Sequence, residues 1–316
     1  MWRPALVLIL GAFIAPSSAR AQSADPNWPT QLVRIVVAVS AGSQSDIIGR
    51  AMADELSRRW KREVIIENRP GLAGTASVAK SAADGHTLLL ASNGHAMIQS
   101  LNRNLTFEPI ADFAAVTKVA ALPGIFVVPP ESGPKSLGEL IALAKANPGT
   151  LNYASAGLGS ASSIGTELLK AAAGIDLVHV PHKGVPEAHI SVMRADTALF
   201  MTFFSAGGDL IATGKLRAIA VAGNRRTAVL PELPTVREAG LPEYDYEAWF
   251  GLLAPAGTAR AVIDKINADV TEVARLETIG GRFARLGVDI ATSTPEEFER
   301  LVKSDSARFV RLFGKA

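Results

Sequence analysis

Cysteine is absent from the 316-residue sequence, which excludes disulfide bonds, thiol catalysis and cysteine-ligated metal sites. Aromatic residues are scarce at 6%, whereas 27 glycines and 18 prolines supply many turns. Hydrophobic residues make up 48% and charged residues 20% of the chain, proportions typical of a folded protein and not of a disordered one. The length suits two domains of modest size.

An excess of one charge is also lacking. The 32 lysines and arginines nearly balance the 30 aspartates and glutamates, and no long basic block occurs. Proteins that bind nucleic acids carry a basic patch or stripe that neutralises phosphates. We therefore expect no nucleic-acid partner.

A long apolar run occurs only at the N-terminus. Arg3 precedes the apolar residues 5–14, and residues 19–21 have the small-x-small pattern of a cleavage site. The run is shorter than the roughly 20 residues that span a bilayer, which favours a signal peptide (1–21, cut after Ala21) over an uncleaved membrane anchor. Cleavage removes two of the 32 basic residues, so the exported product carries 30 basic and 30 acidic residues.

Strand-like and helix-like segments alternate along the rest of the chain, which predicts an α/β fold. Strands are expected at 32–39, 64–67, 87–91, 124–128, 151–154, 177–180, 197–202, 216–222 and 248–253. Helices are expected at 47–60, 75–82, 136–146, 162–173, 187–194, 259–276, 278–286 and 295–313. Two βαβ units and a helical tail predict a discontinuous two-domain protein, with one domain formed by 22–123 and 250–316 and the other by 124–249. We expect a ligand cleft between the domains, because ligands of open α/β sheets sit beyond the carboxyl ends of the strands.

Two loops rich in small residues each follow a predicted strand and open a predicted helix. Close backbone approach and a helix N-terminus both favour an anion at such a loop, and Asp46 is expected to cap the first helix. For either loop alone, helix capping without a ligand is an equally good explanation. Two such loops at equivalent positions of the two domains favour the binding of a small anion. The residues that we expect to bind it are Ser40, Ala41, Gly42, Ser43, Gln44, Asp46, Ser155, Ala156, Gly157, Gly159, Ser160 and Ser162.

Signatures of catalysis and of cofactor binding are missing. The second loop has neither the third glycine of the dinucleotide fingerprint nor the Gly-Lys-Ser/Thr of a phosphate-binding loop. His179 and His182 flank Pro181 on an extended stretch, where they point to opposite faces, so we expect no metal site. No Gly-x-Ser-x-Gly elbow occurs, although an exported hydrolase remains the alternative from a different class. We expect no cofactor.

Several segments resemble the Bug family, the periplasmic solute receptors of tripartite tricarboxylate transporters. They lie in the family's order over the whole mature chain: 28–30, 34–37, 41–50, 64–71, 84–88, 151–157, 178–184, 214–218, 233–236 and 249–258. The resemblance implies a periplasmic, monomeric, non-enzymatic receptor with a type II periplasmic-binding-protein-like fold. It also implies a small organic carboxylate as ligand, held largely by loop amides, hydroxyls and water. The partners are then the permease subunits of such a transporter or, alternatively, a membrane sensor.

The sequence departs from the family pattern around the expected cleft. The family's first loop reads Pro-Ala-Gly-Gly, but Ser40 and Ser43 replace its proline and its second glycine. Segment 92–99 resembles the family's second loop but is one residue short, and a tyrosine of the family is His182 here. The resemblance adds these candidate ligand-binding residues: Ser92, Asn93, His95, His182, Lys183, Thr202 and Phe203.

The strand that typically ends Phe-Asp-Asn in the family reads Met201-Thr202-Phe203, so an acidic residue that can line the cleft is missing. Phe203 and Phe204, together with Met97 and Ile98, would give a more apolar wall. This predicts an aromatic or medium-chain carboxylate as ligand and not an amino acid. The alternative is that both phenylalanines pack into the core and that the pocket stays polar.

Overall fold

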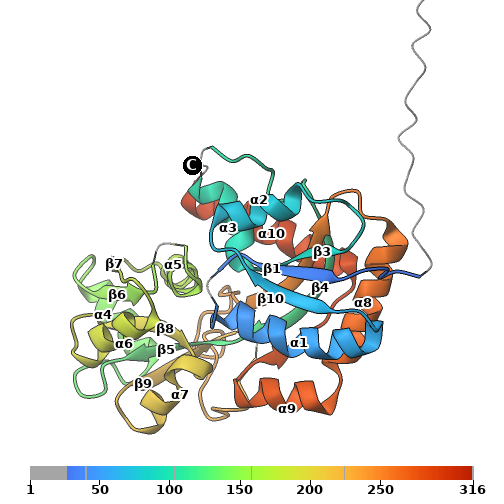
Figure 1. Cartoon of the computed structure of the whole chain (residues 1–316). Helices are drawn as coiled ribbons and strands as arrows, with labels where there is room; N and C mark the ends of the chain where they lie inside the picture. Colours follow the sequence, from blue (N-terminus) through green and yellow to red (C-terminus); the bar gives the residue numbers. More distant parts are fainter. Residues whose placement is uncertain (1–26, 40, 103, 158, 224, 315–316) are drawn as a thin grey trace, which may run out of the picture.

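The computed structural model describes residues 27–39, 41–102, 104–157, 159–223 and 225–314 (Figure 1). The predicted signal peptide, with its cleavage after Ala21, and Ser40 of the first loop lie outside the described residues. None of the helices that the structure describes combines the length and the apolar character needed to cross a membrane.

A six-stranded sheet with the strand order β11–β4–β10–β3–β1–β2 forms the first half of the molecule. Strands β1, β2 and β3 pair in parallel, whereas β10 runs antiparallel to both β3 and β4. The bounds are β1 (Val33–Val37), β2 (Val64–Asn68), β3 (Thr87–Ser92), β4 (Phe113–Leu122), β10 (Ala248–Pro255) and β11 (Asp289–Ile290).

Helices cover both faces of this sheet (Figure 1). On one face lie α1 (Gln44–Trp60), α8 (Arg260–Ala274) and α9 (Glu277–Arg285). On the other lie α2 (Leu72–Ala79), α3 (Asn93–Leu101) and the long C-terminal helix α10 (Pro295–Phe313), which packs along α3.

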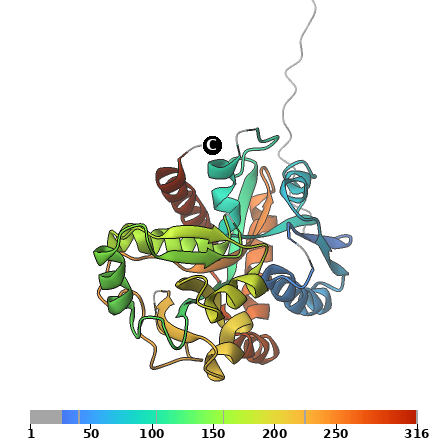
Figure 2. The same cartoon turned by 90° about the vertical axis from the view of Figure 1, so that its left-hand side faces the viewer.

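The second half is a five-stranded sheet with the order β7–β6–β8–β5–β9, which faces the viewer in Figure 2. Its strands are β5 (Gly124–Val128), β6 (Asn152–Ser155), β7 (Val178–Pro181), β8 (Leu199–Phe203) and β9 (Arg217–Ala222). Its helices are α4 (Leu137–Ala146), α5 (Ala161–Ala173), α6 (Val185–Met193) and α7 (Phe204–Ala212).

Alternate side chains of β5 enter two different hydrophobic clusters. Ile125 and Val127 pack with residues of α6 and α7, whereas Phe126 and Val128 join the cluster that contains α4 and α5. Successive side chains of a strand point to opposite faces, so a nearly continuous apolar sequence is what a sheet covered on both faces requires. The predicted α/β class with two sheets is therefore confirmed.

The chain passes between the two sheets twice, at Pro123 and through residues 223–247. Strand β10 begins at Ala248, which pairs with Leu122, so the first sheet includes two residues that the predicted boundary at 249/250 gave to the other domain. The division into domains otherwise stays a prediction.

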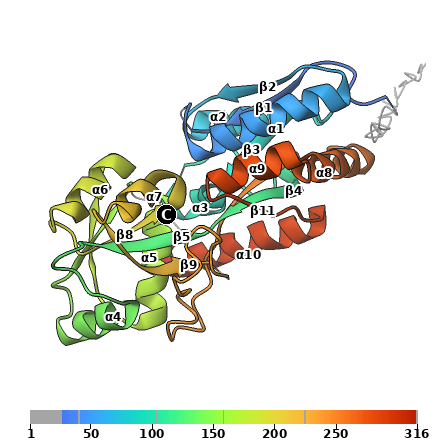
Figure 3. The ribbon, with the colours of Figure 1, turned by 90° about the horizontal axis from the view of Figure 1, so that it is seen from below.

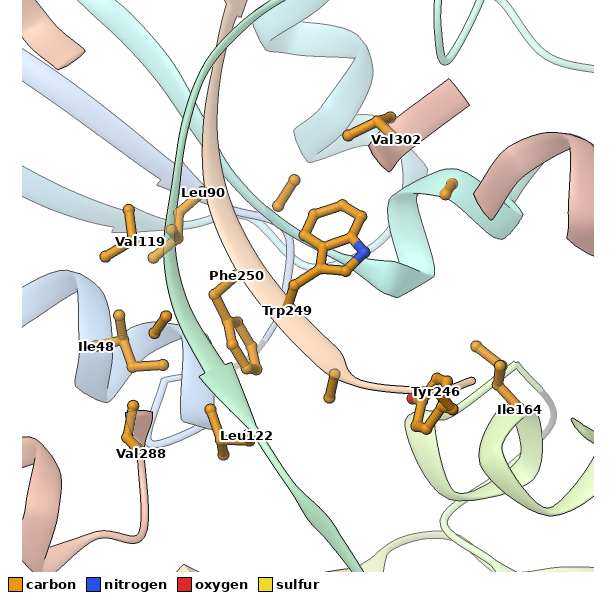
Figure 4. Packing of buried hydrophobic residues seen from close by; sticks show 14 of the residues in the cluster. Ile48, Leu90, Val119, Leu122, Ile164, Tyr246, Trp249, Phe250, Val288 and Val302 are labelled. Atoms are coloured by element: carbon orange, nitrogen blue, oxygen red, sulfur yellow. The ribbon is translucent and has the colours of Figure 1, made fainter. Parts of the chain in front are cut away.

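One hydrophobic cluster runs from the first sheet through the second connection into the second half (Figure 4). Trp249 and Phe250 of β10 lie on its first-half side, and Tyr246 lies beside Ile164 of α5 on the other. The hydroxyl of Tyr246 donates to the backbone oxygen of Ala161, at a distance of 3.1 Å. The connection is therefore packed and hydrogen-bonded, not a free linker.

The side chain of Asn93, at the start of α3, ties this connection to the first half. Its Oδ1 accepts from the backbone nitrogen of Trp249 at 2.8 Å, and its Nδ2 donates to the oxygen of Glu247 at 3.1 Å. The same Nδ2 lies 3.4 Å from Oδ2 of Asp305, which accepts from the Trp249 indole at 2.7 Å. Both polar atoms of the Asn93 side chain therefore have partners within the protein.

Several details of the predicted elements were wrong. Segment 92–99, predicted as a loop, is mostly the helix α3, and β4, α7 and β11 were not predicted. Asn93 and Gly94 have the composition of a turn, but α3 packs along α10, and its Met97 side chain is only 1% exposed. Tertiary packing thus overrides the weak local preference of these residues.

Asn93→Ala should destabilise the protein by about 2 kcal/mol, because it leaves a buried backbone donor and acceptor without their partner. Urea unfolding followed by circular dichroism measures the change. Asn147→Ala is the matched control, since Asn147 is exposed and makes its side-chain bond only to Leu143 O in the described structure. Equal loss in the two variants would contradict the structural role of Asn93.

Candidate ligand-binding site

The first predicted loop closes on itself around the start of α1. Ser43 is the N-cap of this helix, and its Oγ accepts from the backbone nitrogen of Asp46 at 3.3 Å. The Asp46 carboxylate reaches back and accepts from the nitrogen of Gly42 at 2.9 Å. The prediction that Asp46 caps the helix is therefore wrong, as is the predicted start at Ile47, because Ser43 supplies the cap and α1 begins at Gln44.

Asp46 acts on the loop and on its own helix. Its side chain is 5% exposed and forms an ion pair with Arg50 at 3.0 Å. Burial by itself raises the pKa of Asp46, but the hydrogen bonds from Arg50 and Gly42 outweigh burial and hold the pKa below its usual value. The carboxylate stays charged and fixes the shape of the loop at neutral pH.

The second predicted loop uses serine hydroxyls in the same way. Ser160 is the N-cap of α5; its Oγ accepts from the nitrogen of Ser163 at 3.3 Å and donates to the oxygen of Gly157 at 2.7 Å. The Ser162 hydroxyl, 2.9 Å from Ser160 Oγ, therefore donates to it and accepts from the nitrogen of Ala156 at 3.0 Å. The amide of Ala156 is thus bonded within the loop.

Ser155 ends β6 and is fully buried. Its Oγ accepts from the nitrogen of Gly157 at 3.1 Å and lies 2.6 Å from Nε2 of His179. A serine next to a histidine is the arrangement a hydrolase needs, but a nucleophile must also be reachable by substrate. With 0% exposure, Ser155 serves the loop's internal bonding. The amides of Ala156 and Gly157, expected to face a ligand, are both used inside the loop.

The described residues include several contacts between the two halves near these loops. Ser205 Oγ, in the first turn of α7, donates to Oε1 of Gln44 in α1 at 3.1 Å. Phe204 packs against Gly287, which follows α9, so that a Cβ on Gly287 would lie 2.9 Å from the Cβ of Phe204. Figure 3 shows α7 next to α1 and α9.

The third contact joins the second loop to α3. Gly159 has a φ of +75°, and a Cβ there would lie 2.6 Å from Cδ1 of Leu101. The positive φ favours glycine at this position.

A pocket of about 270 Å³ lies at the carboxyl ends of β1 and β3, between α2 and α3. All of its described lining residues come from the first half, and one of them, Leu101, also contacts Gly159 of the second loop. Its lining residues are Ala38, Val39, Ser45, Gly71, Leu72, Thr75, Leu89, Leu90, Ala91, Ser92, Gly94, His95, Ile98, Leu101 and Asn102.

Sequence reasoning placed Ser92 and His95 in the site and Ile98 in its wall, and it missed the wall formed by α2 and the end of α3. The turn at 68–71 could have indicated this wall, because it follows β2 at the same edge of the sheet at which the first loop follows β1. Leu72 and Thr75 follow that turn.

His95 is one of the buried polar residues of the pocket wall and is 5% exposed. Its Nε2 lies 2.6 Å from the carbonyl oxygen of Pro109, which can only accept, so Nε2 carries the proton. Burial lowers the pKa of His95 to about 4, although the bond to Pro109 opposes the shift, and the ring is therefore neutral at neutral pH. Its Nδ1 is consequently an acceptor, and it has no partner among the described residues.

The other predicted site residues lie outside the pocket lining. Thr202 is buried, with its Oγ1 2.9 Å from Nε2 of His189, and Phe203 packs against the large hydrophobic cluster. Lys183 is exposed. His182 is half-buried, and its Nε2 has no partner among the described residues.

The predicted apolar wall is only partly present. Ile98 lines the pocket, whereas Met97 is buried in the core and Phe204 packs against the smaller cluster of the second half. Among the described residues, no three histidine, aspartate or glutamate side chains come together as a metal site would require.

Two α/β halves joined by two connections, with a pocket at the carboxyl ends of the first sheet's strands and helix N-termini beside it, are the architecture of periplasmic solute-binding proteins. Residues 48–316 match the family described as "Tripartite tricarboxylate transporter family receptor". The chain belongs to this family and is one of its solute-binding receptors.

Individual relatives cover nearly the whole chain. Protein BugT of Bordetella pertussis is 30% identical over 96% of this chain and 95% of its own length. The solved structure of Rpa4515 from R. palustris with adipate has a TM-score of 0.78 at 29% identity, covering 92% of this chain and 99% of that one. MatC from Rhodopseudomonas palustris, solved with malate, has a TM-score of 0.74 at 29% identity, covering 90% and 100%.

Asp46→Asn should lower stability by about 1 kcal/mol at neutral pH, because the charge that accepts from Gly42 and Arg50 is lost. A carboxylate with a lowered folded-state pKa stabilises above its unfolded pKa, near 3.9, and loses that effect as the pH falls through the folded value. The gap between wild type and variant in urea unfolding should therefore be full at pH 6 and close below about pH 4.

Asp54→Asn on the same helix is the control, since Asp54 is exposed. A gap for Asp46→Asn that persists unchanged at pH 3 would contradict the role of its charge.

Proposed function

We propose that this receptor captures a small organic carboxylate between the β1–α1 loop and the β6–α5 loop and delivers it unchanged to the permease subunits of a tripartite tricarboxylate-type transporter. The observation that carries the proposal is a pocket beside the first loop, one wall residue of which also contacts the second loop. Val39 and Ser45 line the pocket next to the first loop, and Leu101, another lining residue, contacts Gly159 of the second loop. The adipate and malate bound to two relatives support a carboxylate as ligand.

Neutral donors are suited to hold the carboxylate. The first amides of α1 and α5 have no partner within their helices, and the serine caps take one amide each, at Asp46 and Ser163. Gln44 adds a side-chain Nε2 that is buried without a partner among the described residues. A buried donor with no acceptor is costly, and a ligand oxygen would satisfy it.

The two halves are expected to close on the ligand by moving about the two connections that join them. A ligand that contacts both loops binds the closed arrangement more strongly than an open one, and this difference in affinity shifts the population toward closure. The contacts Gln44–Ser205 and Gly159–Leu101 would form the closed interface.

The periplasmic location of the receptor and its membrane partner are part of the same proposal. Cleavage after Ala21 releases a monomer into the periplasm, where it meets the permease or, as the alternative partner, a membrane sensor. Neighbouring genes for permease subunits would support the first partner, and genes for a sensor would support the second.

Carboxylates should raise the melting temperature of the purified protein in a saturable way, because a ligand that binds only the folded state stabilises it. A panel of organic acids in a thermal-shift assay measures this, with mass spectrometry of the ligand recovered afterwards. Recovery of the acid unchanged is expected. Conversion of the acid that depends on Ser155 or His179 would instead establish a hydrolase.

Gly42→Val and Gly157→Val should each abolish binding while the protein still folds. Both glycines have positive φ values, +78° and +116°, so a β-branched side chain would force the loop out of its conformation. Gly174→Val is the matched control, since Gly174 has a φ of +61° with open space around it and caps the far end of α5. Normal calorimetric affinity in the two loop variants would place the carboxylate elsewhere.

A further inference from the structure

We propose that Leu101 sets the maximum length of the ligand, which is an extended, unbranched organic acid whose carbon chain lies along helix α3. The inference rests on the proposed function, since it takes the end of the pocket at the first loop as the place of the carboxylate. It names a specificity-determining residue for that function. Three observations carry it: the course of the pocket, the character of its two ends and the contact between Leu101 and the second loop.

The pocket follows one face of α3 from the first turn of the helix to the last. Its lining residues on this helix are Gly94, His95, Ile98 and Leu101, and Asn102 comes directly after them. Residues three or four positions apart lie on the same face of a helix, so these residues form one stripe. The helix has 9 residues and is therefore about 13 Å long, which makes the pocket an elongated one.

Helix α2 and strand β3 supply further walls of the pocket. Leu72 and Thr75 of α2 line it, as do residues 89–91 of β3, and aliphatic side chains predominate in the lining. An extended carbon chain can contact these walls along the whole pocket, whereas a compact, branched acid of the same volume fills only a part of it. The shape of the pocket therefore favours an unbranched acid.

The end of the pocket at the sheet edge suits the carboxylate. Strands β1, β2 and β3 are parallel, so α1, α2 and α3, which follow them, all begin at this edge. The first amides of a helix have no partner within the helix and favour an anion, and neither α2 nor α3 has a side-chain cap in the described structure. The carboxylate therefore belongs at this end, beside the first loop.

The opposite end of the pocket lies at the last turn of α3, where Ile98 and Leu101 present aliphatic side chains. Leu101 lies against the second loop, because a Cβ on Gly159 would be only 2.6 Å from its Cδ1. Hydrogen bonds within that loop brace it, since the nitrogen and the Oγ of Ser160 donate to the oxygen of Gly157 at 3.2 and 2.7 Å. Leu101 therefore has no room to move toward the second half while the halves are in contact.

A length limit follows from this contact. Each methylene group that enters the pocket should raise the affinity about fourfold, because its apolar surface leaves water. A chain that extends past Leu101 must displace this side chain or hold the second loop away, and the gain in affinity then stops. The pocket, at about 270 Å³, is larger than the roughly 150 Å³ of a cavity that holds benzene, so several methylene groups enter before the limit.

Calorimetry with unbranched acids of increasing length tests the inference on the purified protein without its predicted signal peptide. Two series are used, the monocarboxylates from butanoate to decanoate and the dicarboxylates from succinate to sebacate. In any series that binds, affinity should rise with each methylene group up to a limit and then stop rising. The branched isomers 2-ethylbutanoate and 2,2-dimethylsuccinate should bind about tenfold more weakly than hexanoate and adipate, respectively, because they bury fewer methylene groups.

Leu101→Ala should move the limit toward longer acids by about two methylene groups, because it removes the side chain at the end of the pocket. The affinity for an acid of that greater length, divided by the affinity for the acid at the wild-type limit, should rise about tenfold. Leu101 is 38% exposed, so the variant is expected to fold. Leu101→Val, which shortens the side chain less, should move the limit about half as far.

Leu72→Ala is the matched control within the pocket, since Leu72 is also a 38% exposed lining residue but lies at the start of α2, at the carboxylate end. It should lower the affinities together and leave the limit in place. Leu143→Ala, at a 44% exposed position on α4 outside the lining, should change neither. Leu101→Met conserves the size of the side chain and should keep the wild-type limit.

An identical limit in wild type and Leu101→Ala would overturn the inference, and so would a limit that moves equally in Leu72→Ala. Binding of the branched isomers as tight as that of hexanoate and adipate would also overturn it. Each of these results would leave the proposed function intact. If no acid of either series binds, the proposed function itself fails, and the inference falls with it.

Discussion

The hydrogen bonds of the Asn93 side chain are the constraint on which the site depends. They join the start of α3 to the backbone of residues 247 and 249, where the chain enters β10 from the second half. Helix α3 supplies a wall of the pocket and, through Leu101, the surface that meets the second loop. Asp305 of α10, whose pKa is raised by burial, completes the network through Trp249 and Asn93. One amide thus sets the position of the pocket wall relative to the connection.

Rigidity of the two loops comes from their own polar groups. In the first, the Asp46 carboxylate accepts the Gly42 amide, and in the second, serine hydroxyls accept the amides of Ala156 and Gly157. These amides are not available to bind a ligand. The loops are preorganised, however, so less conformational entropy is lost when a ligand binds. A site built in this way binds a carboxylate with helix N-termini and neutral donors, and needs no cation in its wall.

Much of the architecture could be predicted from the sequence, because buried strands and amphipathic helices leave a periodic pattern. The loops were found for the same reason, since each stands between a strand and a helix. The rest of the pocket wall could not be predicted, because Leu72 and Leu101 come from two helices that are brought together by their packing and not by their composition. Asp46 has the residue type of a cap, but only the geometry shows that Ser43 takes that place. Whether the predicted loop residues touch the ligand stays a prediction.

The two connections between the halves differ in length, but both are held by hydrogen bonds to the halves that they join. The first is Pro123 alone, with Leu122 paired in one sheet and Gly124 in the other. The second is long, but Val236 is hydrogen-bonded to Val221 of β9, and Tyr244 and Tyr246 are bonded to the backbone of α5. In the proposed closure, the halves would turn about Pro123 and the residues just before Ala248. Because Leu122 and Ala248 pair in the first sheet, these two turning points lie side by side, and the line that joins them would be the axis of the motion.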